Sequence, residues 1–189
     1  MQAETALDIR VTRVTAPSAE PLTLEQVKTD RVIDHNEHDD LLTSAIQAAR
    51  EVAESITGRA LMPQQWQQLH PCPGSEISLH VWPAINIESV TVDGETIDHA
   101  ALLASGEMEF LSGDDPALIW PGFRGKRSLI IYTAGYADAD SVPAAIKKWL
   151  LLHIGSQYEH RESEIIGSQT QRVRYTGSLI AAFTVRRFF

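Results

Sequence analysis

The chain has 189 residues, enough for one compact domain, with 43% hydrophobic and 22% charged residues and a formal net charge of −9. This acidity argues against a general nucleic-acid coat, because binding to phosphates needs local positive charge. No apolar run reaches the ~20 residues that cross a bilayer, and the N-terminus lacks an apolar signal segment. Cys72 is the single cysteine, so no intrachain disulfide can form and cytosolic synthesis is expected.

Two helices are predicted in the N-terminal third of the chain. Residues 21–30 form a short helix, for which Thr23 is a suitable N-cap with Gln26 three residues later. Residues 37–59 form a longer helix with Gly58 as its C-cap. Its apolar residues recur at helical spacing and are expected to form one stripe that faces the core: Leu42, Ala45, Ile46, Ala49, Val52, Ala53 and Ile56.

Period-two patterns replace the helical ones over residues 62–135. The run EISLHVW (76–82) alternates, and EMEFL (107–111) and SLIIYTAGY (128–136) are further strand candidates. Asp93-Gly94 separates two strand-like runs, which is a strong signal for a tight hairpin.

The last predicted element before the C-terminal arm is a helix over residues 140–162, with Pro143 in its first turn. The resulting fold class is α+β: a helical base of two to four helices, with a small β-rich insert between the second and third main helices. We expect a single domain over residues 1–189, and its parts are a helical part (16–61), the insert (62–135), a C-terminal helix (136–170) and a C-terminal arm (171–189).

The stretch DHNEHDD (34–40) concentrates acids and histidines. As a calcium loop it fails, because Asp39 stands where glycine is needed and Ala45 where the bidentate glutamate is needed. His35 and His38 have a spacing that zinc could use. A helix begins here, however, and acids in a first turn interact favourably with its free N–H groups. We therefore interpret the cluster as a helix start, capped by Asp34 or Asn36, without a functional metal.

No other stretch combines a nucleophile, a base and an orienting group, so no catalytic residue and no cofactor is predicted. The C-terminal arm, residues 171–189, contains four arginines, several aromatic residues and no acid. Arginine and aromatic residues are enriched in protein–protein hot spots. The arm is therefore a candidate docking segment, and packing on its own subunit is the alternative. The candidate partner-binding residues are Arg172, Arg174, Tyr175, Phe183, Arg186, Arg187, Phe188 and Phe189.

Two stretches, residues 16–66 and 129–162, carry a family resemblance. The first contains EPLTL, AAR and TGRAL followed by QQW, and the second contains TAGY, VP, IK and YEHRE. In this order they resemble the head–tail connector (adaptor) proteins of tailed bacteriophages and prophages, in the branch with a β-rich insert between helices.

The resemblance implies a non-enzymatic virion protein, made in the bacterial cytoplasm and located in the virion neck. Such proteins form a homo-oligomeric ring, a dodecamer, beneath the portal protein after DNA packaging, and offer a platform to the next neck protein. Their C-terminal segment typically contacts the portal, DNA passes through the ring without specific contacts, and no membrane is involved.

Three alternatives remain open. The chain could be another neck or tail-completion protein. From other classes, it could be a small metal-dependent hydrolase that uses His35, His38 and nearby acids, or a regulatory DNA-binding domain that uses the arginines of the arm.

Overall fold

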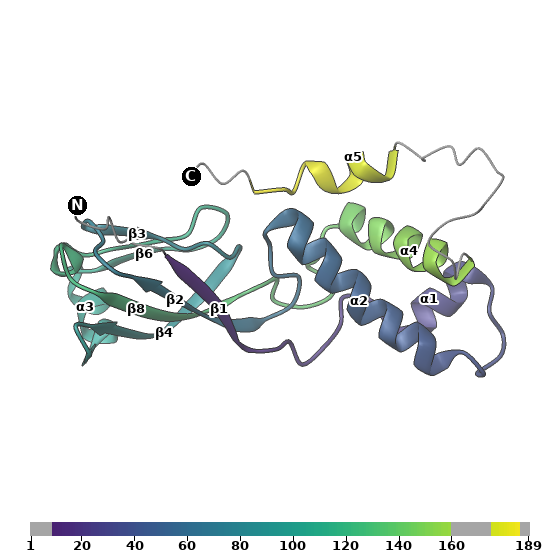
Figure 1. Cartoon of the computed structure of the whole chain (residues 1–189), viewed down its shortest axis with the longest axis horizontal. Coiled ribbons are helices and arrows are strands. Elements are labelled where there is room, and N and C mark those ends of the chain that lie inside the picture. The colour runs from purple at the N-terminus through teal and green to yellow at the C-terminus, as the bar shows by residue number, and fades with distance from the viewer. Residues whose placement is uncertain (1–8, 160–174, 186–189) are drawn as a thin grey trace, which may run out of the picture. The chain divides into compact units, whose positions relative to one another are not determined.

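The computed structural model describes residues 9–159 and 175–185, and the chain divides into two compact units (Figure 1). The β unit comprises Met1–Ser18 and Met62–Ala137, and the helical unit comprises Ala19–Leu61 and Asp138–Phe189. Helices and antiparallel sheets are both present, which confirms the predicted α+β class. Within the described residues, none of the helices has the length and apolar character needed to span a bilayer.

The β unit contains two antiparallel sheets. The five-stranded sheet has the order β1 (Arg10–Thr15), β2 (Gln64–His70), β8 (Ser128–Ala134), β4 (Ala84–Val92) and β5 (Glu95–Ile97). The three-stranded sheet has the order β3 (Glu76–Ser78), β7 (Ala117–Ile119) and β6 (Glu109–Leu111). Two short helical elements, α3 (His99–Ser105) and the 3-10 helix Pro121–Phe123, connect strands.

The β4–β5 hairpin is built as its sequence predicts. Asp93 and Gly94 both have positive φ, at 51° and 91°, which matches the right-handed twist of the strands that they join. Along the central strand β8, Ser128, Ile130 and Tyr132 are buried in alternation with half-buried neighbours. Strand β8 therefore follows the period-two pattern expected of a sheet with one face on the core.

Strand β2 has a polar sequence, QQWQQLH, and was not predicted. Gln68 is fully buried there, and its amide links distant segments. Its Oε1 accepts from the backbone N–H of His80 at 2.9 Å, and its Nε2 donates to the carbonyl of Ser78 at 2.7 Å. The hydroxyl of Tyr132 accepts from the backbone N–H of Val81 at 3.1 Å. The Gln68 amide and the Tyr132 hydroxyl thus both have partners, which removes most of the cost of burying them.

The helical unit contains α1 (Leu24–Arg31), α2 (Asp39–Thr57), α4 (Ala144–Glu159) and α5 (Tyr175–Ala181). The capping box predicted for the first helix is present: the Thr23 hydroxyl accepts from the Gln26 N–H, and the Gln26 side chain accepts from the Thr23 N–H. Helix α2 ends at Gly58, which has φ 70° as expected of a C-cap.

Helices α2 and α4 pack against each other and form the core of this unit, as predicted. Ile46 and Leu150 are 4% and 1% exposed at the contact. Helix α1 contacts both helices, and so does α5. Gly155 of α4 allows a close approach, because a Cβ atom built there would lie 2.0 Å from Cζ of Arg31.

The single apolar stripe expected on α2 is wrong in part. Val52 and Ile56 are 37% and 44% exposed, and Ala45 is only half-buried. The residues that α2 does bury are Leu42, Ile46, Ala49, Arg50, Ala53 and Thr57. The apolar residues of α2 cover about half of its circumference at 100° per residue, which is wider than the strip that neighbouring helices cover.

Candidate partner-binding surfaces

The polar stretch 34–40 joins three helices of the helical unit. Lys28 of α1 donates to Asn36 at 2.6 Å and forms an ion pair with Asp39 at 2.8 Å, at the start of α2. His38 Nδ1 lies 2.6 Å from the hydroxyl of Tyr158 in α4. The rings of His35 and His38 are in edge contact at 5.0 Å. These contacts give the cluster a structural role in which side chains fix the relative positions of α1, α2 and α4.

The cap predicted for this helix start is wrong. The N-cap of α2 is His38, which makes no side-chain capping bond, and neither Asp34 nor Asn36 occupies that position. The amide oxygen of Asn36 accepts from Lys28 instead. In the part of the chain that the structure describes, no three potential metal ligands gather. That the cluster has no functional metal stays a prediction, which elemental analysis of the purified protein tests.

A buried arginine ties the segment before α1 to α2. The side chain of Arg50 is 3% exposed, and its Nε donates to Glu20 at 2.8 Å. One of its terminal nitrogens pairs with Glu54 at 3.0 Å. Because this charge is paired and hydrogen-bonded, it can lie in the unit's interior. Arg50 therefore marks the side of α2 on which the N-terminal segment runs.

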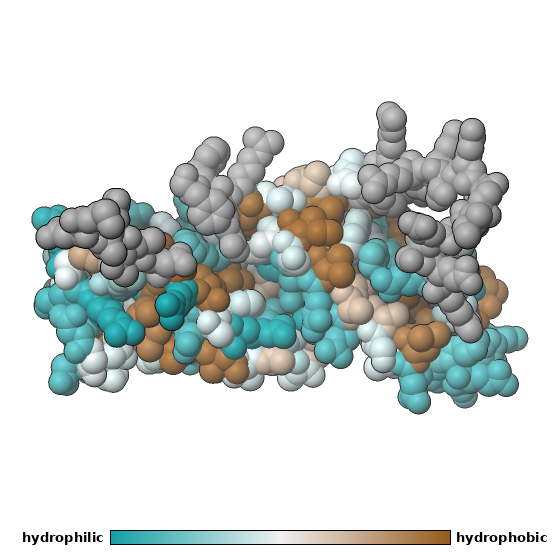
Figure 2. All heavy atoms as spheres, viewed as in Figure 1, coloured by the Kyte–Doolittle hydropathy of each residue, from teal (hydrophilic) through white to brown (hydrophobic). Residues whose placement is uncertain are grey.

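A second apolar stripe lies on α2 outside the α4 contact. We call it the outer stripe, and its residues are Leu41, Ala45, Ala48, Val52 and Ile56. Leu41 is 49% exposed, comparable with Val52 and Ile56. Figure 2 shows apolar atoms following α2 across the viewed face. At the Leu41 end, a groove of about 510 Å³ lies between this stripe and Gln157 and Tyr158 of α4.

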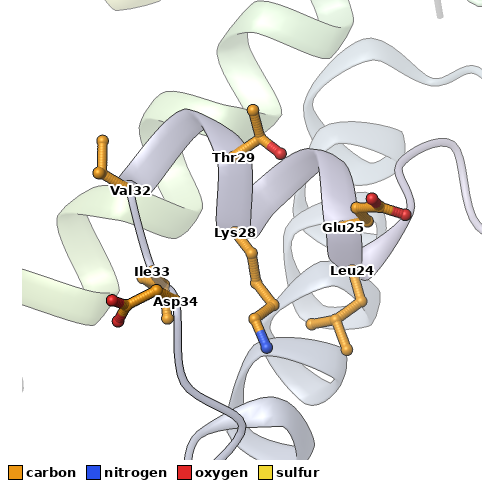
Figure 3. Close-up of a pocket in the computed structure, with 7 residues that line it drawn as sticks. All are labelled: Leu24, Glu25, Lys28, Thr29, Val32, Ile33 and Asp34. Atoms are coloured by element: carbon orange, nitrogen blue, oxygen red, sulfur yellow. The ribbon is translucent and has the colours of Figure 1, made fainter.

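A second hollow, of about 730 Å³, lies along α1 and the residues after it (Figure 3). Leu24, Lys28 and Ile33 are among its lining residues, and Val32 lies at its edge, where α1 ends. Val32 is 89% exposed and has φ 54° and ψ 46°, the left-handed conformation that a β-branched residue rarely adopts. In Figure 3 its side chain points away from Lys28 and Leu24.

Of the predicted binding residues, the structure describes only part. Arg172, Arg174, Arg186, Arg187, Phe188 and Phe189 lie outside the described residues. Tyr175 begins α5, and Phe183 lies two residues after its end. The carbonyl of Phe183 accepts from Nε of Arg59 at 2.8 Å, and the N–H of Val185 donates to the carbonyl of Thr57 at 2.8 Å. Ile180 of α5 is 3% exposed, so the described part of the arm packs on its own unit.

Two histidines in the described part of the chain, His70 and His153, have a lowered pKa, and both lie among residues of the folded core. Burial lowers the pKa of His70 in β2 to about 4, and the nearby His80 adds to the effect. Burial also lowers the pKa of His153 in α4, whose ring stacks on Trp149. Nε2 of His70 lies 2.6 Å from Nε2 of Gln68 and belongs to the buried polar network of the β unit. Neither histidine is placed beside a nucleophile.

Residues 21–91 match the model of the family described as "Phage gp6-like head-tail connector protein". Over this segment the chain is similar to phage head–tail connector proteins. The match covers the capping box of α1, all of α2, strands β2 and β3 and all but the last residue of β4. The matched family and the neck structures below are structural particle proteins, which agrees with the prediction of a non-enzymatic protein. No curated protein matches the chain in sequence.

Three solved structures resemble the chain over 95% of its length and 97% of theirs. The first is a chain of the neck of an empty gene transfer agent (GTA) particle computed with C6 symmetry, with a TM-score of 0.74 and 18% identity. The others come from the virion of a native GTA particle (TM-score 0.72, 17% identity) and the neck of a native GTA particle computed with C12 symmetry (TM-score 0.68, 17% identity). At this identity the likeness shows a shared fold.

Proposed function

We propose that the chain is the subunit of a head–tail connector ring in the neck of a virion. In this proposal copies of the chain form a dodecameric ring beneath the portal protein after DNA packaging, and the ring offers a platform to the next neck or tail-completion protein. The observation that carries the proposal is the match of residues 21–91 to the connector family. The fold likeness to neck chains of symmetric particles supports it over nearly the whole chain.

The physical properties of the chain suit this role. A closed ring repeats one heterologous contact, so each subunit needs a rigid body with two unlike sides. The packed helices of the helical unit are such a body, and they carry the exposed outer stripe on one side. The net charge of −9 disfavours a grip on DNA phosphates and is compatible with passage of the DNA through the ring.

In the same proposal the arginines and aromatic residues of the C-terminal arm dock on the portal. The described part, up to Val185, packs against α2 and α4, and the last four residues, Arg186 to Phe189, add two charges and two aromatic rings. A structured base followed by a short basic and aromatic end is suited to insertion between subunits of a partner.

Electron microscopy tests the function directly. The chain is produced in the bacterial cytoplasm and purified. It is then incubated with DNA-filled, portal-bearing heads that lack the connector, and the heads are imaged. We expect a ring of added density below the portal and none on heads without portal. Unchanged portal vertices in the presence of excess protein would refute the proposal.

A further inference from the structure

Among the described residues of the helical unit, the outer stripe and Val32 contain the exposed large apolar side chains. The stripe runs along α2 from Leu41 to Ile56, and Val32 stands at the end of α1. Neither feature is covered by a described element, although runs of exposed apolar side chains commonly mark interaction surfaces.

Helix geometry places the two features on opposite sides of α2. Ala48 and Val52 are each two positions from Arg50, which is a rotation of about 160° around the axis at 100° per residue. Arg50 points to Glu20, in the segment that leads into α1. Asp39, which pairs with Lys28 of α1, lies within about 20° of Arg50 on the same wheel. Helix α1 and Val32 therefore lie on the side of α2 that is turned away from the outer stripe.

We propose that the outer stripe is the surface on which a neighbouring copy of this chain docks, and that the docking copy presents Val32. The inference rests on the proposed ring. One subunit then offers a protruding apolar side chain on one side and an apolar groove on the other. Such a contact is heterologous, so each copy uses both surfaces and the contacts continue around a ring.

The shapes and chemistry of the two surfaces support this occupant. Val32 protrudes almost without cover, and as the left-handed C-cap residue it stands where α1 ends. The groove beside Leu41, Ala45 and Ala48 is formed largely by apolar side chains, and small alanines leave room for an incoming group. An interface of this kind also explains why the apolar face of α2 is wider than the strip that the neighbouring helices cover.

Cross-linking tests the pairing. On a Cys72→Ser background, which removes the exposed native thiol, Val32→Cys and Ala48→Cys are combined in one chain and treated with a short bis-maleimide. The proposal predicts a ladder of dimers, trimers and larger species. Each single-cysteine variant stops at the dimer, because it cannot link a copy on both sides. The matched control combines Val32→Cys with Gln47→Cys, an exposed residue about 100° from Ala48, and is expected to give no ladder.

The experiment is run with the protein at high concentration and again on portal-bearing heads, with imaging of the same samples. A ladder that requires Val32→Cys and Ala48→Cys supports the docking surface. A ring visible on heads without that ladder, or an equal ladder from the Gln47→Cys pair, overturns the docking surface and leaves the proposed function intact. Absence of both ring and ladder overturns both.

Discussion

Acidification is expected to destabilise the β unit through His70. The orientation of the neighbouring Gln68 amide is determined by the structure: its Oε1 accepts from the His80 N–H, so its Nε2 is the donor toward His70. His70 Nε2 must then accept and carry no proton. Protonation would place two N–H donors face to face at 2.6 Å inside the protein, where an unsatisfied donor is costly.

The size of the effect follows from the pKa. Burial lowers the pKa of His70 from 6.5 to about 4, with a smaller contribution from His80. Below pH 6.5 the unfolded chain takes up a proton that the folded chain refuses until about pH 4. The contribution of unprotonated His70 to the free energy of unfolding is therefore fully present above pH 6.5 and is lost as the pH drops toward 4. At 1.36 kcal/mol per pKa unit the loss is about 3 kcal/mol.

Urea unfolding at a series of pH values across this window measures the loss. Tryptophan fluorescence reports on the β unit through Trp66, Trp82 and Trp120. The control is His70→Gln, which cannot titrate but can accept from Gln68 through its amide oxygen. The difference between the two proteins isolates His70 from other groups, including His153, whose pKa burial also lowers.

We expect the free energy of unfolding of the parent protein to fall more steeply than that of His70→Gln between pH 6.5 and about pH 4. Parallel curves for the two proteins would show that folded His70 accepts a proton in this range. The contact with Gln68 would then not keep His70 unprotonated in the folded protein.

Three other changes test the helical core, a close approach and the C-terminal arm. Ile46→Asp buries an unpaired charge and is expected to give insoluble or unfolded protein, whereas Val52→Asp, on the exposed outer stripe of the same helix, stays soluble; equal solubility would contradict the assigned faces. Gly135→Ala is expected to lower the free energy of unfolding by about 1–3 kcal/mol, which a lower midpoint of thermal unfolding would show. The reason is that Gly135 has φ 137° and the new Cβ would lie 2.2 Å from the carbonyl oxygen of Met62. Truncation after Val185 keeps the packed part of the arm and is expected to leave circular dichroism and melting unchanged while abolishing attachment to portal-bearing heads; undiminished attachment would show that the last four residues are not needed.

Several local features of the fold could be read directly from the sequence. The capping box of Thr23 and Gln26, the C-cap at Gly58 and the Asp93-Gly94 hairpin all appear as predicted. Each depends on hydrogen bonds or backbone angles within a few residues, so the sequence window contains the whole interaction. The pairing of the two long helices also followed, because their apolar stripes had no other partner of comparable length.

Other features depended on contacts between distant segments. Strand β2 was missed because Gln68 is polar, and only Ser78, His80 and the sheet around it make its burial favourable. Val52 and Ile56 were expected in the core because they are apolar and recur at helical spacing along α2. Periodicity shows that a helix has an apolar face, but the width of the neighbouring helices determines how much of that face is covered. The exposed remainder, which is the candidate docking surface, therefore became visible only in the tertiary structure, because burial belongs to the contact between segments and to neither segment alone.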